Sequence, residues 1–396
     1  MRQANARRAE VVIVGGGVIG ASVAYHLAAR GCTDVLVLER AATLGAGSTG
    51  RATGGFRAQF ATPVNVALSL LAREKLRRFR DEVGADAGYQ PCGYLFIATA
   101  ARQLAALRAA QRVQRAAGLA EAEELDVDGV LARNPAVRPD DVVGGVFCAT
   151  DGFLRPMQLL DGYAAAARRR GVAFALGETV CGVRREGDRV TGVETHGGVV
   201  HADVVVDAAG AWAAEVARLA GVELPVTPLR RQVACTEPTR ALPADMPMTI
   251  FADDGFHLRV RDGRVLLLWP GPAEAPAPAA TAPSPVAFDD QWLPTVVERA
   301  HRCVPCLADV RVDRARCVAG LYEMSPDGHA IVGRAPGLRN LVLANGSSGH
   351  GVMHAPALGQ LVAEEILDGH ATAVDMGPLR PERFAEGRAS TVPDLF

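Results

Sequence analysis

Three glycines near the N-terminus have the spacing most clearly linked to a chemical function. Gly15, Gly17 and Gly20 form G-x-G-x-x-G directly after a β-branched run over 11–14, and a helical stretch follows. The first glycine allows a tight turn, the second lets a pyrophosphate approach the backbone, and the third lets helix and strand pack closely. Because the helix N–H groups would face the phosphates, the pattern predicts a dinucleotide-binding turn.

An acidic residue ends the next predicted strand, which covers 35–38. Glu39 can accept hydrogen bonds from both hydroxyls of an adenosine ribose, and its charge disfavours the 2′-phosphate of NADP, although Arg40 beside it weakens that argument. The motif by itself fits FAD and NAD equally. No second G-x-G-x-x-G stands between a predicted strand and a predicted helix, so we expect no separate nicotinamide domain.

Composition and charge exclude several other classes. The 396 residues are 49% hydrophobic, which is enough for a large core, and a net charge of -2 gives no general basis for binding nucleic acid or an anionic membrane. Lys75 is the only lysine, so lysine Schiff-base chemistry is excluded unless Lys75 provides it. There is no run of about 18 apolar residues, so we expect no transmembrane segment and a cytoplasmic protein.

The cysteines give no strong sign of a metal site. Cys303 and Cys306 form a single C-x-x-C pair, and no second pair stands at zinc-ligand spacing. We therefore expect reduced thiols and no metal.

Periodicity and turn residues outline the elements that must position these groups. A Gly/Ser/Thr-rich loop over 45–55 precedes predicted helices at 64–82 and 101–117; in the latter we expect a buried face of Ala106, Ala110, Val113 and Ala117. Further elements are predicted as a helix from 156, a hairpin over 180–195, a strand at 204–206, strands near 228–236, 256–260 and 264–269, a Pro/Ala-rich loop over 270–285, a strand at 341–343 and a helix ending at Gly369. The last residues resemble a tail.

Five further stretches make the chain resemble the D-amino-acid oxidase (DAO) family of FAD-dependent oxidoreductases. The resemblance is to the branch containing glycine oxidase, sarcosine oxidase and the flavin subunits of heteromeric sarcosine and proline dehydrogenases. The matching stretches are, in family order, 47–57, 151–156, 207–212, 320–327 and 345–356. The last of these, with Gly349-His350-Gly351-Val352-Met353, is the most specific.

The resemblance implies an α/β fold. It consists of a Rossmann-like FAD-binding domain of the glutathione-reductase type, assembled from discontinuous segments, and an α+β substrate domain on a mainly antiparallel sheet. We expect FAD-domain segments at 1–85, 146–225 and 318–396, a helical or substrate insertion at 86–145 and a substrate domain at 226–317.

The resemblance also implies where FAD would bind. The residues are Gly15, Gly17, Val18, Ile19, Gly20, Glu39, Arg40, Ser48, Thr49, Arg51, Thr53, Gly54, Gly55, Val180, Ala209, Gly210, Gly349, His350, Gly351, Val352 and Met353. Gly320 occupies the position at which covalent members carry a cysteine, and Cys317 is out of register, so we expect non-covalent FAD. A helix beginning near His354 would favour the negative charge of reduced flavin.

Four residues are implied as catalytic or substrate-binding. Arg57 aligns with an arginine whose fork can pair with a substrate carboxylate, the alternative being a surface arginine. Met353 stands where some relatives have a lysine. His257 falls where sarcosine oxidase has an oxygen-activating lysine and is either an acid–base group or a histidine without a chemical role. Tyr322 falls near a carboxylate-binding arginine and can hydrogen-bond a substrate.

These residues predict FAD-dependent oxidation of the amine carbon of an N-substituted, cyclic or free amino acid. Hydride would pass to flavin N5, giving an imine that hydrolyses. Two alternatives stay open: a 2-hydroxy-acid dehydrogenase in which His257 accepts the hydroxyl proton, and a flavin subunit of a heteromer with little activity alone.

The electron acceptor is either oxygen or a quinone or electron-transfer partner. Because Lys75 is the only lysine, a dehydrogenase is favoured slightly over an oxidase. The remaining candidates for a cation near the flavin are His257 and Arg259, which alternation places on one face of a strand.

Overall fold

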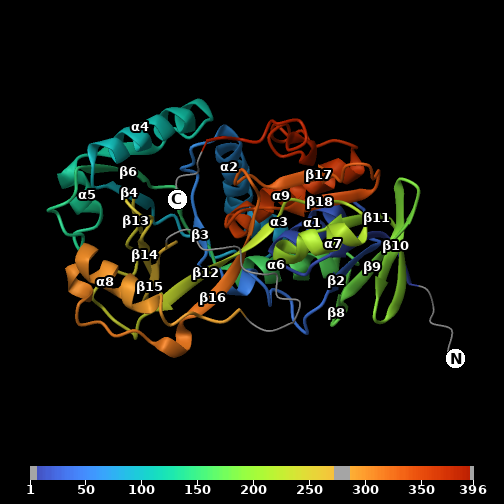
Figure 1. Ribbon diagram of the computed structural model, residues 1–396, viewed down its shortest axis with the longest axis horizontal. Coiled ribbons are helices and arrows are strands. Elements are labelled where there is room, and N and C mark those ends of the chain that lie inside the picture. Colours follow the sequence, from blue (N-terminus) through green and yellow to red (C-terminus); the bar gives the residue numbers. More distant parts are fainter. Residues whose placement is uncertain (1–6, 272–285, 393–396) are drawn as a thin grey trace.

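The computed structural model describes residues 7–271 and 286–392, whose strands form two large sheets lying side by side (Figure 1). Residues 272–285, most of the predicted Pro/Ala-rich loop, fall outside the described residues. No helix in the described ranges is long and apolar enough to cross a membrane.

The first sheet has a parallel centre. In the described residues its order is β17 (Ile331–Arg334), β18 (Leu341–Asn345), β11 (Gly198–Asp207), β1 (Arg7–Val14), β2 (Val35–Glu39) and β8 (Ala173–Leu176). Strand β1 pairs in parallel with both β11 and β2, whereas β17 is an antiparallel edge. The predicted hairpin is formed by β9 (Val180–Glu186) and β10 (Arg189–Thr195). Strand β10 also pairs with β11 in an antiparallel arrangement, which joins the hairpin to the sheet.

The strand β1 shows why the sequence forms this sheet. Val11 and Ile13 belong to one buried cluster and Val12 and Val14 to another, so successive side chains enter cores on opposite faces. A strand covered on both faces requires a continuous apolar run, as in parallel sheets with helices on each side. The predicted Rossmann-like arrangement is confirmed.

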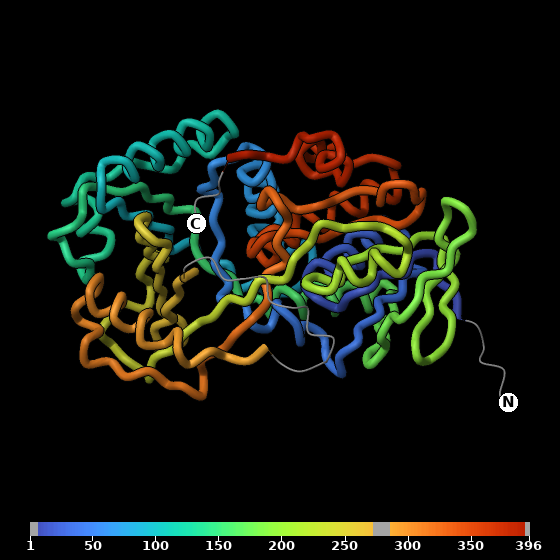
Figure 2. Tube along the Cα trace, in the orientation of Figure 1, coloured from blue at the N-terminus to red at the C-terminus, as the bar shows by residue number. Residues whose placement is uncertain are grey.

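Helices from distant parts of the chain cover this sheet. The helix α1 (Val18–Ala29) joins β1 to β2 and packs against α9 (Gly351–Leu367) and α6 (Pro156–Arg169). Figure 2 shows the blue N-terminal and red C-terminal parts of the trace in the same half of the molecule. The helix α9 begins at Gly351, three residues before the predicted start, so Gly351, Val352 and Met353 form its first turn.

The second sheet is mainly antiparallel. Its order is β16 (Val318–Met324), β12 (Thr227–Cys235), β15 (Arg264–Leu268), β14 (His257–Arg261), β13 (Met248–Phe251), β4 (Tyr94–Ala98), β6 (Gly144–Cys148) and β5 (Ala122–Leu125). We call this second sheet the roof sheet. The division of the chain into five segments stays a proposal; the proposed segments 318–396 and 86–145 contribute the strands β16 and β4 to the roof sheet.

The remaining elements of the described residues lie between these strands or follow them along the chain. They are η1 (Thr49–Arg51), β3 (Gly55–Phe56), α2 (Pro63–Arg77), α3 (Phe79–Val83), α4 (Ala101–Ala116), α5 (Val127–Arg133), β7 (Gly152–Phe153), η2 (Gly210–Trp212), α7 (Ala213–Leu219), α8 (Leu293–Cys303), η3 (Pro305–Leu307), η4 (Arg314–Arg316) and η5 (Pro381–Arg383). The helix predicted at 64–82 is therefore two helices, α2 and α3.

The predicted buried face of α4 is only partly confirmed: Ala110 is buried, Val113 and Ala117 are half-buried, and Ala106 is exposed. The fully buried face is Gln103, Leu107, Ala110, Gln111 and Gln114. The side-chain amides of Gln111 and Gln114 donate to the carbonyls of Ala122 and Phe60, at 2.7 and 3.2 Å. These glutamines are buried because they satisfy backbone carbonyls, which hydrophobic periodicity does not register.

Part of the C-terminal segment predicted as a tail packs against the rest of the protein. The Arg383 side chain is 1% exposed and makes a bidentate pair with Asp327, at 2.8 and 2.9 Å. It also donates to the carbonyl oxygens of Leu379 and His329. This contact ties the chain end to the segment that follows β16.

Candidate active site

A cavity of about 960 Å³ is lined by residues of both sheets. Its walls include the turn between β1 and α1, the end of β2, the loop 45–55, the start of β9, η2, several roof strands and the residues that begin α9. All the residues predicted to bind FAD or substrate line this cavity except Gly20. The structure thus brings together residues from widely separated parts of the chain.

The glycine turn is required by close packing of the backbone. Gly15 has a φ of +117°, and a Cβ there would lie 2.3 Å from the Ala208 carbonyl oxygen. A Cβ at Gly20 would lie 2.0 Å from the Gly15 carbonyl oxygen, which explains why Gly20 packs helix on strand and does not reach the cavity. At Gly17 the nearest atom would be Thr49 Oγ1 at 3.5 Å. Gly17 therefore leaves room for a ligand at the N-terminus of α1.

The Glu39 carboxylate is fixed at the cavity wall by backbone amides. Its Oε2 accepts from the Gly16 N–H and its Oε1 from the Ala41 N–H, both at 2.8 Å. Each carboxylate oxygen has a second lone pair, which can accept a ribose hydroxyl. The Arg40 guanidinium stacks 3.6 Å from the centre of the Trp212 ring, and both side chains line the cavity.

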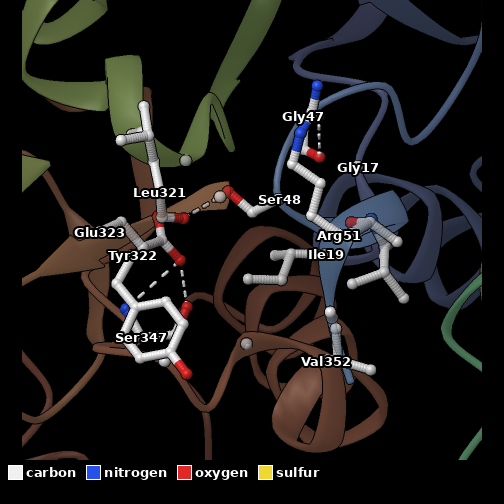
Figure 3. A pocket seen from close by; sticks show the side chains of 18 of the residues that line it. Gly17, Ile19, Gly47, Ser48, Arg51, Leu321, Tyr322, Glu323, Ser347 and Val352 are labelled. Atoms are coloured by element: carbon white, nitrogen blue, oxygen red, sulfur yellow. Dashed lines mark hydrogen bonds between the residues drawn. The ribbon is translucent and has the colours of Figure 1, made fainter. Parts of the chain in front are cut away.

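The loop after β2 is held in place by its own polar side chains (Figure 3). Thr49 Oγ1 accepts from the Val18 N–H at 3.1 Å, and Ser48 Oγ donates to the Leu321 carbonyl at 2.6 Å. Arg51 donates to the Gly47 carbonyl at 2.9 Å. These bonds fasten the loop to α1 on one side and to β16 on the other.

The opposite wall contains a buried carboxyl group with an oxygen that is not hydrogen-bonded. The Ser347 side chain donates to Glu323 Oε1 (Figure 3), and Glu323 Oε2 is buried without a partner among the described residues. Burial raises the pKa of Glu323. A buried polar atom at a cavity wall is satisfied when a ligand occupies the cavity.

A tyrosine ring lies against a glycine just before α9. A Cβ at Gly349, whose φ is +91°, would lie 2.4 Å from the Tyr322 ring, so only glycine permits this contact. The predicted residues Tyr322 and Gly349 are therefore neighbours, and Met353 lines the same cavity.

Arg57 lies at the cavity but is engaged by the protein. The residue is 4% exposed, and its guanidinium donates to the Gln59 carbonyl at 2.8 Å and lies 3.2 Å from His350 Nε2. Arginine can only donate, so His350 Nε2 is the acceptor and the ring is neutral there. The Arg57 N–H contacts Met353 Sδ at 3.4 Å, which brings two predicted residues together. Arg57 is not a surface arginine.

His257 lines the cavity from β14, but it is not a cation. Burial lowers the pKa of His257 to about 4. Its Nδ1 lies 2.8 Å from the Gly255 carbonyl, which can only accept, so Nδ1 carries the proton and Nε2 has a free lone pair.

Arg259 does not provide the expected charge at the cavity either. Its guanidinium donates to the Thr53 carbonyl at 2.9 Å and stacks 3.4 Å from the centre of the Phe153 ring. Arg259 therefore braces the loop 45–55 from outside the cavity lining.

The residues present fit FAD. The cavity is long enough to extend from the glycine turn and Glu39 to the wall of Tyr322 and Met353, and it contains an open approach at Gly17 and the unsatisfied Glu323 oxygen. A Cβ built on Gly320 would lie 3.2 Å from the Arg51 side chain, so a larger residue at this position would crowd Arg51.

Several lining residues were not predicted as site residues. Trp212 and Glu323 belong to stretches that carried the resemblance, whereas Tyr94 and Arg231 come from strands of the roof sheet without a recognisable motif. A Cβ at Gly55 would lie 1.9 Å from the Tyr94 hydroxyl oxygen. The glycine at position 55 is therefore the trace that Tyr94 leaves in the sequence of the loop.

Comparisons with known proteins agree with this geometry. The family described as FAD dependent oxidoreductase (DAO) matches residues 10–365. The 4-methylaminobutanoate oxidase (formaldehyde-forming) of Paenarthrobacter nicotinovorans is 31% identical over 94% of this chain and 45% of its own length, so the chain spans less than half of that relative. FAD-dependent oxidoreductase domain-containing protein 1 of Xenopus laevis is 31% identical over 95% of this chain and 83% of its own length.

Among solved structures, L-proline dehydrogenase from P. horikoshii superposes with a TM-score of 0.89 at 26% identity, covering 97% of this chain and 100% of that one. The match to the family covers most of the chain, and the glycine turn, Glu39 and the residues before α9 all line one cavity. The chain therefore belongs to the DAO family of FAD-dependent oxidoreductases.

Proposed function

We propose that this chain, with non-covalent FAD, oxidises the amine carbon of an amino acid. The observation that carries the proposal is the convergence of Arg57, His257, Tyr322 and Met353 on one cavity that also contains the predicted FAD residues. When bound, FAD supplies the two-electron acceptor. The residues of the chain bind and orient the substrate and exclude water from it.

The substrate amine must be unprotonated before the adjacent carbon can lose hydride. His257 Nε2, with its free lone pair, can accept a hydrogen bond from the amine N–H and so direct the nitrogen lone pair toward that carbon. The pKa of about 4 makes His257 a hydrogen-bond acceptor at neutral pH, not a strong base. That property favours amine oxidation over the 2-hydroxy-acid alternative, which needs a base for the hydroxyl proton.

Arg57 places a positive charge beside this position. Its guanidinium is held by Gln59 and His350 and packs 4.1 Å from the centre of the Phe60 ring, so the charge is fixed in one orientation. A fixed cation next to the cavity favours a substrate carboxylate without reorganisation on binding. Met353 contributes an apolar surface and no charge.

Anaerobic mixing of the FAD-loaded protein with amino acids, sarcosine, proline and 2-hydroxy acids tests the proposal. We expect the flavin absorbance to bleach with at least one amine and with none of the hydroxy acids. Bleaching by hydroxy acids alone would contradict it. In the same preparation, acid precipitation should leave FAD in the supernatant, because Gly320 offers no thiol for a covalent link.

A further inference from the structure

One arginine at the cavity has no part in the sequence pattern. Arg231 lies on β12, where its backbone pairs with Gly320 of β16, and its side chain lines the cavity. Opposite it, the Arg51 side chain packs against Gly320, with its Cβ 3.2 Å from where a Gly320 Cβ would lie.

Arg231 differs from Arg230 in having no acidic partner among the described residues. Its hydrogen bond to the Arg230 carbonyl is long, at 3.4 Å, and it forms no ion pair within residues 7–271 and 286–392. Arg230, on the opposite face of the strand by alternation, pairs with Asp289 at 3.3 Å. Arg57 is occupied by Gln59 and His350. A half-buried guanidinium without a counter-ion is unfavourable until an anion binds.

The surroundings of Arg231 indicate which end of the cavity this anion would occupy. The Arg231 guanidinium carbon lies 5.9 Å from the centre of the Tyr322 ring. The positive charges of Arg57 and Arg231 both lower the pKa values of His257 and Tyr322, in opposition to burial in the case of Tyr322. Both guanidinium charges therefore act on His257 and Tyr322, and all four residues line the cavity.

The acidic side chains of the cavity come from other elements. They are Glu39, Glu178, Glu215 and Glu323, and none of them is on β12, β13, β14 or β15. The strands β12 to β15 of the roof sheet thus contribute the cation Arg231 to the cavity and no acidic side chain. The carboxylates of the cavity come from β16 and from the elements of the first sheet.

We propose that Arg231 binds the substrate carboxylate from the roof sheet, beside Tyr322 and opposite Arg57. This inference rests on the proposed function and deepens it, because it assigns the substrate class as amino acids with a free carboxylate. The planar fork of the guanidinium suits both carboxylate oxygens, and the Tyr322 hydroxyl can donate a third hydrogen bond. Arg57 then supports the same carboxylate as a fixed charge below it.

The test uses two matched pairs of probes, L-proline with L-prolinamide and sarcosine with sarcosinamide. The concentration dependence of anaerobic flavin reduction, or of flavin absorbance changes where no reduction occurs, gives an apparent Kd for each. The FAD-loaded wild type should prefer each carboxylate over its amide by roughly 30-fold or more. Arg231→Gln should reduce this preference to about 3-fold or less, with the FAD content unchanged.

Arg230→Gln is the control, because Arg230 carries the same charge one residue away and does not line the cavity. It should keep the wild-type preference, and Arg231→Lys should restore part of what Arg231→Gln loses. An Arg231→Gln enzyme with wild-type preference overturns the inference, and so does complete loss of preference in Arg57→Gln with Arg231 intact. Both results leave amine oxidation standing. A wild type whose flavin responds to neither carboxylates nor amides contradicts the proposed function as well.

Discussion

The wall of the cavity on the first sheet and the wall on the roof sheet are built from different parts of the chain. On the first sheet, the backbone forms most of the surface: Gly15 and Gly17 expose the start of α1, and backbone N–H groups hold Glu39. On the roof sheet, side chains form the surface, among them His257, Arg231 and Met248. A backbone wall suits a cofactor that is the same in every member of a family. A wall of side chains can change with the substrate while the strands stay in place.

The two walls also differ in how completely their polar groups are satisfied. Glu39 has protein partners for both oxygens, and Arg51, Ser48 and Thr49 hold the intervening loop. Arg231 has no acidic partner in the described part of the chain. Glu39 and the loop of the first wall are therefore held by the protein itself, whereas the proposed partner of Arg231 on the second wall is the substrate.

The largest expected effect is on the backbone wall. Gly20→Ala places a methyl group 2.0 Å from the Gly15 carbonyl, and Gly15→Ala adds an unfavourable φ to a contact of 2.3 Å. Each should destabilise the protein by about 3 kcal/mol or more and abolish FAD binding. Gly17→Ala, with its nearest contact at 3.5 Å, should fold and lose FAD affinity only. Thermal unfolding with and without FAD separates these outcomes, and an unaltered Gly20→Ala protein would refute the packing argument.

An intermediate effect concerns Asp151, which holds the segment carrying Arg57. Asp151 accepts from the Ala58 N–H at 2.7 Å and from the Gln59 amide at 3.0 Å. Asp151→Ala should cost about 2–3 kcal/mol in the free energy of unfolding, because two buried donors lose their acceptor. In Asp151→Asn, the new side chain keeps an oxygen that can accept from the Ala58 N–H, but its amide would face Gln59 Nε2, which also donates to the Tyr94 carbonyl at 3.1 Å. One buried hydrogen bond is therefore lost, and this change should cost about 1–2 kcal/mol at acid pH, less than Asp151→Ala.

The same carboxyl group predicts a pH dependence with a definite sign. Burial raises the pKa of Asp151 to about 6, so the native protein holds this proton at pH values where the unfolded chain has released it. The contribution of Asp151 to the free energy of unfolding therefore decreases as the pH rises from about 4 to about 6. Measured by urea unfolding, Asp151→Asn should gain stability relative to wild type across that range and no further above it. A difference that is constant with pH would contradict this assignment.

The smallest effect concerns the electron acceptor. His257 is neutral, and Arg259 is directed to the loop carbonyls, so no described residue of β14 places a cation at the cavity. We expect substrate-reduced flavin to react slowly with oxygen and faster with a quinone or dye. In stopped-flow mixing with oxygen, His257→Lys should reoxidise roughly tenfold faster than wild type, with His257→Gln as the uncharged control. Fast reoxidation of the wild type by air would show that this chain is an oxidase without such a cation.

The difference between the walls also explains what could be predicted from the sequence. Gly15, Gly17 and Glu39 are close in the chain and have a fixed spacing, so local pattern was sufficient to predict the β1–α1–β2 unit of the first sheet and its dinucleotide-binding turn, whereas the other FAD residues were expected only from the family resemblance. Arg231 is one of the many arginines of this chain, and its neighbour on β12 is also an arginine. Only its pairing with Gly320 of β16 and its position in the cavity lining distinguish it from Arg230.

The incorrect predictions have the same origin. The buried face of α4 is determined by Gln111 and Gln114 satisfying distant carbonyls, and the chain end is fixed by Arg383 pairing with Asp327. These are polar contacts between residues far apart in the sequence, which apolar periodicity cannot indicate.

The central claim is that this cavity oxidises an amine, and a single-turnover product assay tests it most directly. FAD-loaded protein is mixed anaerobically with an excess of the amino acid that bleaches it fastest, and the oxidised product is measured against reduced flavin. One imine, or the carbonyl group formed by its hydrolysis, for each reduced flavin is the predicted result; the amine is released from an open-chain substrate and stays on the product of a cyclic one. Flavin reduced by the substrate without any imine or carbonyl group at the amine carbon would contradict the account.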